Sequence, residues 1–390
     1  MRTHTNFLVL VAALLSLMQT TATAYVGLCC GKCGGNMPMN IPGGGIPETH
    51  EFRIKTSPMY MRMNGLRDGT DAVEADNILG MPVMMGQPTG LYMAAPTGMD
   101  MYMLNIATGY SFSDRFFAGL MLMAKELRMD MRFNGAMQSL TGHEGFTMKT
   151  GGVADTMLMT KYRLFADDPL IPTHQASLLF SLSLPTGSIN EKNTKHPLDA
   201  RAREQAPYGM QLGSGTLDPT VGLLYQASRS PLWWGANASY TARVYDNRRE
   251  YRLGDEARLD LYGMYQVRHD FLLQAQFNAS WQGRIKGEMD EAASGESGRV
   301  VRGDPGSPYT TPLWDPDHYG GRRLFATLGF QWQPAPLHIV DLSLSLPLAQ
   351  DLNGPQLETD YRLMLTWYLE IPTRKSIRYR LRGNDSRLGF

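Results

Sequence analysis

The chain has 390 residues, and its 37 basic side chains balance its 37 acidic ones, so its formal net charge is zero. A neutral chain has no broad field that attracts polyanions, and we therefore expect no nucleic-acid partner. Its three cysteines, Cys29, Cys30 and Cys33, lie within five consecutive residues, which excludes a disulfide framework for a fold of this size.

Residues 1–24 have the pattern of a secretory signal peptide. Arg2 precedes an apolar run from Phe7 to Met18, and Ala22-Thr23-Ala24 supplies a small-residue cleavage site. We predict Sec-type export of a mature chain that begins near Tyr25, with a membrane-anchoring helix or a lipoprotein anchor as the alternatives. The rest of the sequence contains no apolar run of the roughly 20 residues that a membrane-spanning helix needs.

A segment rich in cysteine and methionine follows, over residues 25–50. Thiolate and thioether sulfur select Cu(I) over hard cations. The Cys-x-x-Cys spacing can also hold zinc, although no second pair accompanies it. The alternative is that a periplasmic partner docks on this segment. Its candidate metal ligands are Cys29, Cys30, Cys33, Met37 and Met39.

From residue 51 to residue 370 the sequence alternates between apolar and polar side chains. The odd positions from Phe271 to Trp281 are apolar, whereas the even positions from Gln274 to Gln282 are Gln, Asn or Ser. Alternate residues share one face of a strand, and an apolar outer face with a polar inner face is typical of transmembrane barrels. We predict an all-β protein, a transmembrane antiparallel up-and-down β-barrel, with a soluble β-sandwich as the alternative.

The connections between these segments alternate between short and long, as periplasmic turns and external loops do in outer-membrane barrels. The pattern predicts about twelve strands, the first over Glu51–Met63. Residues 64–98 would form a long external loop or a lumen constriction. Residues 371–390 would form a basic tail, unless Ser376–Arg382 pairs as an extra strand. The short links lie at 113–115, 166–173, 228–231, 269–270 and 333–336, and the long ones at 134–150, 187–210, 246–254, 285–321 and 350–356.

Two motifs resemble a known family. Leu182-Ser-Leu-Pro-Thr-Gly187 ends one predicted strand, and Gly213-Ser-Gly-Thr-Leu-Asp-Pro-Thr-Val-Gly-Leu-Leu-Tyr225 leads into the next. The combination is similar to the outer-membrane transporter-like family named for the MetA pathway of phenol degradation, over roughly residues 99–370. The resemblance implies an outer-membrane barrel that passes small, often hydrophobic, molecules. The segment before residue 99 and the basic tail depart from the family pattern.

Twenty of the 26 methionines lie between Met37 and Met159, mostly in pairs two residues apart. Such pairs share one face of a strand, and the polar residues on that face place it toward the lumen. Flexible methionine that packs a plugged lumen, or lines a pore for apolar solutes, is the alternative to a metal path. The predicted lumen residues are Met59, Met61, Met63, Met101, Met103, Met121, Met123, Met157, Met159, Lys161, Met264 and Met364.

These features predict an outer-membrane channel or transporter of a Gram-negative cell, embedded in outer-membrane lipid, with a small solute or a metal ion as its cargo. The cysteine cluster favours a soft metal such as Cu(I) over small hydrophobic compounds as the cargo. Repeated weak thioether sites along the lumen would let such an ion enter and leave. A plugged structural or binding barrel is the third hypothesis. The sequence contains no recognisable catalytic constellation, so we expect no enzyme, and copper is the one cofactor that it suggests.

Overall fold

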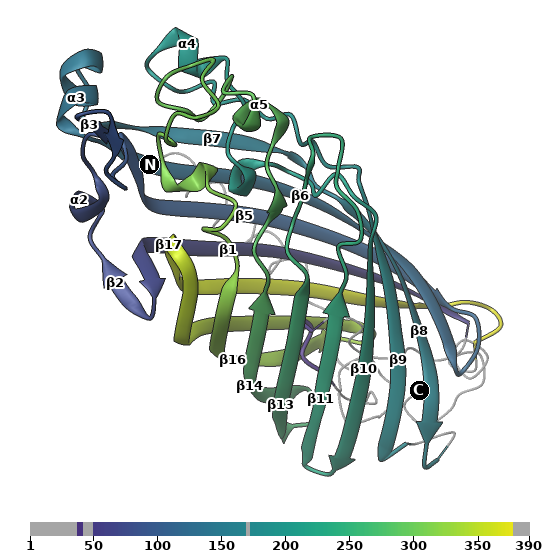
Figure 1. Ribbon diagram of the computed structural model, residues 1–390. Helices are drawn as coiled ribbons and strands as arrows, with labels where there is room; N and C mark the ends of the chain where they lie inside the picture. The colour runs from purple at the N-terminus through teal and green to yellow at the C-terminus, as the bar shows by residue number, and fades with distance from the viewer. Residues whose placement is uncertain (1–36, 42–49, 169–171, 377–390) are drawn as a thin grey trace.

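The computed structural model describes residues 37–41, 50–168 and 172–376. Eleven antiparallel strands form one closed barrel, because the last strand pairs with the first (Figure 1). The ring consists of β1 (Glu51–Gly69), β5 (Ala94–Ser111), β6 (Phe116–Phe133), β8 (Thr156–Ala166), β9 (His174–Leu184), β10 (Asp218–Arg229), β11 (Leu232–Thr241), β13 (Glu256–Arg268), β14 (Phe271–Gln282), β16 (Gly321–Ala335) and β17 (His338–Pro372).

Strand β17 is long because it passes along the barrel twice. Residues 338–352 pair with β16, and residues 352–372 pair with β1, both antiparallel. The chain reverses near Gly354, whose φ of +70° lies in the left-handed region that glycine adopts without strain. The assigned count of eleven strands is one fewer than the predicted count of about twelve, because β17 is assigned as one strand although it crosses the barrel twice. The chain does reverse within the link predicted at 350–356, but these residues are assigned to β17, so the link is a tight reversal and not a long loop.

Burial along the strands follows the alternation that the sequence predicts. In β14, Leu273 and Phe277 are 47% and 56% exposed, whereas Gln274 and Gln276 between them are 4% and 3% exposed. The polar residues therefore face the barrel interior, and the apolar residues form the outer surface. This arrangement, together with a closed ring that leaves no strand edge, is the one that lipid requires of a spanning sheet.

The two ends of the barrel differ in their connections. Short turns at 112–115, 230–231, 269–270 and 336–337 lie at one end, where β8 also ends and β9 begins, and the longer loops lie at the other end. Figure 1 shows the short helices gathered at the long-loop end. The loops carry β2 (Asp71–Val73), α2 (Ala75–Ile78), β3 (Val83–Met84), β4 (Gln87–Pro88), α3 (Gly135–Thr141), β7 (Gly145–Val153), α4 (Asp199–Ala202), η1 (Tyr208–Met210), β12 (Tyr251–Arg252), β15 (Lys286–Gly287), α5 (Asp290–Ala293) and η2 (Pro312–Trp314).

Helices contribute little to the architecture. None of the helices in the described part of the chain has the length and apolar character needed to cross a membrane.

The boundaries of the first loop and of the tail also differ from the predictions. Strand β1 continues to Gly69 and β5 begins at Ala94, so the first external loop covers residues 70–93 instead of 64–98. Ser376 is buried and donates a 2.6 Å hydrogen bond to Glu51 Oε1, which holds residues 373–376 beside the start of β1. The predicted signal peptide, and the choice between tail and extra strand from residue 377 onward, lie outside the described residues.

Candidate functional site: the barrel interior

The predicted methionine positions lie side by side on the inner face of β1, β5, β6 and β8. Directly opposed residues include Met59 with Met103, and Met61 with Met101. On one face of an antiparallel pair, opposed Cβ atoms lie roughly 4.5–5.5 Å apart, so these side chains contact each other. We call this set the methionine wall: Met59, Met61, Met63, Met101, Met103, Met121, Met123, Met157 and Met159, with Met364 opposite Met59 on β17.

Methionines outside the middle of this wall are packing residues. At the loop end, Met99, Met129 and Met148 lie in one row and are buried in a core that includes Met210 and Leu313 from the external loops. Met63 and Met101 pack against the edge of this core. The filler explanation therefore holds at the loop end of the wall. The wall methionines farther from the loop end, such as Met103 and Met121, are half-buried and lie outside this core.

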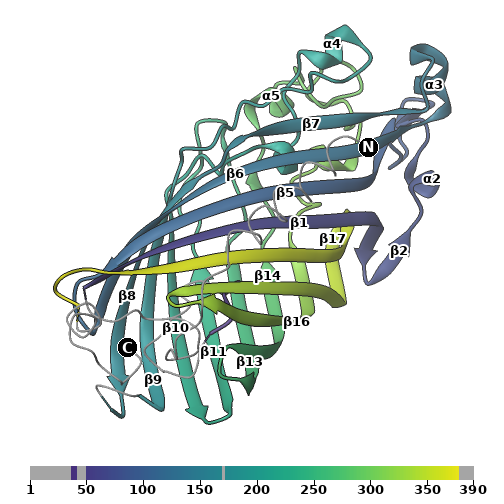
Figure 2. The ribbon, with the colours of Figure 1, turned by 180° about the vertical axis from the view of Figure 1, so that it is seen from behind.

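The opposite wall of the barrel is polar. Asp260 accepts hydrogen bonds from Asn237 (3.0 Å) and from Asn278 (2.8 Å), and Thr327 links Asn278 to Ser345 with bonds of 2.6 and 2.7 Å. These five residues belong to β11, β13, β14, β16 and β17. Figures 1 and 2 show β1, β5 and β6 on the other side of the barrel from β11, β13 and β14. The interior is thus two-sided, with thioethers facing amides, hydroxyls and carboxylates.

Residues 37–41 lie inside the barrel, near the short-turn end. Met37, Met39 and Ile41 are 0%, 2% and 1% exposed and pack with Trp233, Tyr262, Met264, Leu272 and Tyr368 from the barrel strands. We call residues 37–41 the plug. Burial of three such side chains stabilises the inserted segment by about 1.5–3 kcal/mol each. Sequence reasoning left open whether the N-terminal segment enters the lumen, since a short irregular segment has no periodic pattern.

The plug is also hydrogen-bonded to the barrel wall. Asn40 and Gln276 exchange two amide hydrogen bonds of 2.9 Å, and Lys55 Nζ donates to the carbonyl of Met39 at 3.0 Å. Gln331 Nε2 donates to the carbonyl of Met37 at 2.9 Å. The amide of Met39 donates to Asp341 Oδ2 at 3.3 Å. Every one of these partners is a wall residue facing inward, so the segment occupies a site built to receive it.

The buried position of the plug affects two of the predicted metal ligands, Met37 and Met39. Met37, Met39 and Met264 share one apolar cluster, so they act as packing residues in this state, and the first two are not accessible to a periplasmic partner. Cys29, Cys30 and Cys33 lie outside the described residues. Within residues 37–41, 50–168 and 172–376, no group of three or more His, Cys, Asp or Glu side chains is arranged to hold a metal ion.

The remaining predicted interior residue, Lys161 on β8, is 2% exposed. Its charge interacts with those of Arg53 and Arg163 near the short-turn end of the barrel. Its predicted inward position agrees with the structure.

A buried carboxylate joins the two family-like motifs. Asp155 accepts hydrogen bonds from the amide of Gly187 (2.9 Å), and from the amide (2.8 Å) and hydroxyl (3.0 Å) of Ser214. A Cβ on Gly213 would lie 2.5 Å from Asp155 Oδ1, and one on Gly187 would lie 2.8 Å from Gly213 Cα, so both positions need glycine. No sequence pattern marks Asp155 as the centre of these motifs, because its partners are 32 and 59 residues away.

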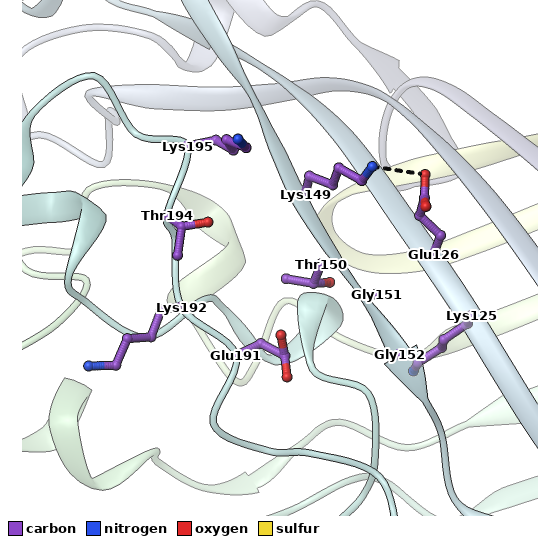
Figure 3. Close-up of a pocket in the computed structure, with 10 residues that line it drawn as sticks. All are labelled: Lys125, Glu126, Lys149, Thr150, Gly151, Gly152, Glu191, Lys192, Thr194 and Lys195. Atoms are coloured by element: carbon purple, nitrogen blue, oxygen red, sulfur yellow. Dashed lines mark ion pairs between the residues drawn. The ribbon is translucent and has the colours of Figure 1, made fainter. Parts of the chain in front are cut away.

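A basic pocket of about 350 Å³ lies at the loop end, between the β6–β7 hairpin and residues 191–195. Four lysines and two glutamates line it: Lys125, Lys149, Lys192, Lys195, Glu126 and Glu191. Figure 3 shows Lys149 reaching Glu126, at 3.3 Å, with the loop residues across the opening. Lys125 is paired in register with Met103, so the pocket adjoins the methionine wall. Lys125 donates to the carbonyl of Gln211 at 2.9 Å, which ties this wall to the loop.

The barrel is similar in fold to solved outer-membrane proteins. The COG4313 outer membrane channel from Pseudomonas putida F1 has 13% sequence identity and a TM-score of 0.52, over 85% of this chain and 99% of that one. The Pseudomonas putida toluene transporter TodX has 9% identity and a TM-score of 0.40, over 83% and 91%. A Pseudomonas aeruginosa FadL homologue has 11% identity and a TM-score of 0.39, over 91% and 99%. No family model matches the sequence, and comparison with curated proteins gives no match.

The first of these likenesses establishes a shared fold, and that fold matches Gram-negative outer-membrane proteins. The predicted outer-membrane barrel is therefore confirmed at the level of fold. The family named for the MetA pathway is not confirmed.

Proposed function

We propose that this protein is an outer-membrane channel that carries small hydrophobic or amphipathic compounds past the methionine wall, with the plug closing its periplasmic end. The main support for this proposal is the two-sided interior, in which half-buried thioethers on β1, β5, β6 and β8 face a hydrogen-bonded polar wall. An apolar solute contacts the thioether side without displacing the hydrogen bonds of the polar side. Methionine suits this task because its flexible side chain adapts to differently shaped ligands.

The plug supports a gated passage. Its apolar side chains fill the interior near the short-turn end. Its backbone makes three hydrogen bonds to wall residues, and the side chain of Asn40 makes two more, so four wall residues hold it. Each bond contributes about 0.5–1.5 kcal/mol net, and water in an opened lumen replaces it. Displacement of the plug is therefore compatible with an intact barrel.

Passage of Cu(I) is the second candidate, and one observation favours it. Met59 lies between Met103 on one side and Met364 on the other, so three thioethers from three strands meet in one row. Three sulfur ligands at such spacing suit a soft monovalent ion, and Cys29, Cys30 and Cys33, which precede the plug in the sequence, would supply further soft ligands. Two of the predicted ligands, Met37 and Met39, are engaged in apolar packing. For this reason we prefer passage of apolar solutes to passage of Cu(I) as the proposed function.

Two triple variants separate these functions. Replacing Met59, Met61 and Met103 with leucine keeps an apolar wall of similar volume but removes the sulfur. Replacing the same residues with glutamine keeps side-chain length but makes the wall polar. Uptake of radiolabelled toluene is measured in Gram-negative cells that express the full chain and lack other hydrophobic-compound channels. Cu(I) binding to purified protein is measured by competition with a chromogenic chelator.

A channel for hydrophobic compounds predicts that the leucine variant keeps toluene uptake and that the glutamine variant loses most of it. A copper path predicts that wild type binds Cu(I) and that both variants lose this binding. Equal toluene uptake by wild type, the glutamine variant and cells without the protein would refute the first function. Undiminished Cu(I) binding by the leucine variant would refute the second.

A further inference from the structure

Three arginines project into the interior near the loop end of the barrel. Arg258 on β13 and Arg323 on β16 are both paired in register with Ser280 on β14, which lies between them. Two strand spacings separate their Cα atoms, roughly 9–10 Å. Each is two residues inside the loop end of its strand, and its outward neighbours, such as Leu259, face lipid. Arg362 follows on β17, and its guanidinium interacts electrostatically with those of Arg258 and Arg323. We call these residues the arginine cluster.

The cluster holds hydrogen-bond donors that the protein does not use. Arg258 pairs with Glu256 on its own strand at 2.6 Å, yet its side chain remains 50% exposed, so it faces open space inside the barrel. The guanidinium groups of Arg323 and Arg362 donate no hydrogen bond and join no ion pair within the described residues. Two guanidinium groups therefore present free N–H groups to the lumen.

The nearby acidic groups do not neutralise the cluster. Glu256 and Asp260 are the carboxylates that interact with Arg362, against two other arginines. Glu256 is engaged by Arg258, and Asp260 by the amides of Asn237 and Asn278. Three positive charges thus face two negative ones, and both carboxylates already have partners.

An apolar surface adjoins these donors. The guanidinium carbon of Arg362 lies over the ring of Phe325, 4.6 Å from its centroid, so the donors of Arg362 stand beside an aromatic surface. Arg362 is also paired in register with Met61, a residue of the methionine wall. A ligand held at Arg362 can therefore place an apolar body on thioethers while its charged end meets guanidinium.

We propose that the arginine cluster is a binding site for the carboxylate of small amphipathic anions, so that the channel prefers organic acids with an apolar body over their neutral counterparts. This inference rests on the proposed passage of small compounds, whose substrate class it narrows. A guanidinium binds a carboxylate in a planar, two-bonded geometry, and the unused N–H groups of Arg323 and Arg362 supply the donors. The neighbouring thioethers supply the contact for the apolar body.

The test measures binding separately from passage. Benzoate, its neutral isostere benzamide, and inorganic phosphate are titrated by calorimetry into the full chain purified in a neutral detergent. The test variants are Arg323→Gln and Arg362→Gln, singly and together. Arg322→Gln is the matched control, because Arg322 adjoins Arg323 in β16 but is exposed on the outer face, with the same change of charge. Arg362→Lys keeps the charge and removes the planar fork.

We expect benzoate to bind at least tenfold more tightly than benzamide or phosphate. Each single glutamine variant should weaken benzoate binding about tenfold, because loss of one charge-assisted interaction of about 1.4 kcal/mol changes the dissociation constant by a factor of ten. Arg362→Lys should weaken binding less, because it keeps the positive charge. Arg322→Gln should bind as wild type does. Benzamide or phosphate binding as tightly as benzoate, or unchanged benzoate binding by the double variant, would overturn the proposal.

Toluene uptake by the double glutamine variant keeps the two proposals distinguishable. Loss of benzoate selectivity with toluene uptake intact removes only the arginine site. Specific benzoate binding by a protein that carries neither toluene nor benzoate into cells removes the channel function and leaves the site.

Discussion

Replacing Gln276 with alanine should open the channel, because this residue exchanges two hydrogen bonds with Asn40 of the plug, both 2.9 Å. Each bond contributes about 0.5–1.5 kcal/mol, so the plugged state loses roughly 1–3 kcal/mol. At about 1.4 kcal/mol per factor of ten, the ratio of open to plugged channels should rise roughly 5- to 150-fold. The barrel itself should persist, since the backbone pairing of β14 does not depend on this side chain.

Single-channel recording in planar bilayers measures this ratio as open probability. A chain lacking residues 25–41 sets the fully open conductance. Gln350→Ala is the matched control, since Gln350 is also a buried inward glutamine with two hydrogen bonds, but both go to Thr359 of β17. An open probability that rises equally in the two variants would mean that wall loosening, not plug release, opens the pore. An unchanged open probability in Gln276→Ala, with the truncated chain conducting, would refute the assigned role of these two bonds.

Two further outcomes follow from the external loops. Burial lowers the pKa of His196 to about 4 from its ordinary 6.5, with the charge of Arg201 adding to the effect, and the amide of Leu198 donates to its Nδ1 at 3.1 Å. The unfolded chain takes up this proton first, so stability that is complete above pH 6.5 is lost as the pH falls toward 4. His196→Gln should flatten the decline in the urea midpoint between pH 7.5 and 5; an equally steep decline would exclude His196 as its cause. Gly213→Ala should destabilise the barrel by about 1–3 kcal/mol through overpacking against Asp155, measured as a lower thermal midpoint. Gly263→Ala, where a Cβ meets no atom within 4 Å, is its control, and equal midpoints for the two variants would contradict the role given to Asp155.

Alternation predicted the barrel well, because each residue of a barrel strand faces either lipid or the interior. The odd and even faces of β14 and of β5 are those that the sequence indicates, and the paired methionines are opposed in register as expected. The reversal near Gly354 lies within the link predicted at 350–356, but it is tight instead of long, since ladder pairing extends to Leu352 on one side and resumes at Gln356 on the other.

The candidate site was only partly accessible to sequence reasoning. A pattern in one strand shows which residues share a face, but not what fills the space in front of them. Whether a methionine is filler depends on loops that fold over it, as Met210 and Leu313 do at the loop end. The arginine cluster was equally hidden, because only the assembled sheet brings Arg323 level with Arg258 on either side of β14.

The position of the plug has a consequence for the order of assembly. Its hydrogen-bond partners lie on β1, β14, β16 and β17, strands from both ends of the chain that flank the seam where the ring closes. Pairing of β1 with β17 brings together residues 283 to 321 positions apart, the slowest kind of contact to form. Residues 37–41 can gather these strands before their backbones pair, acting as an internal template. Chains without this segment should then insert into membranes more slowly, even though the finished wall contains every strand.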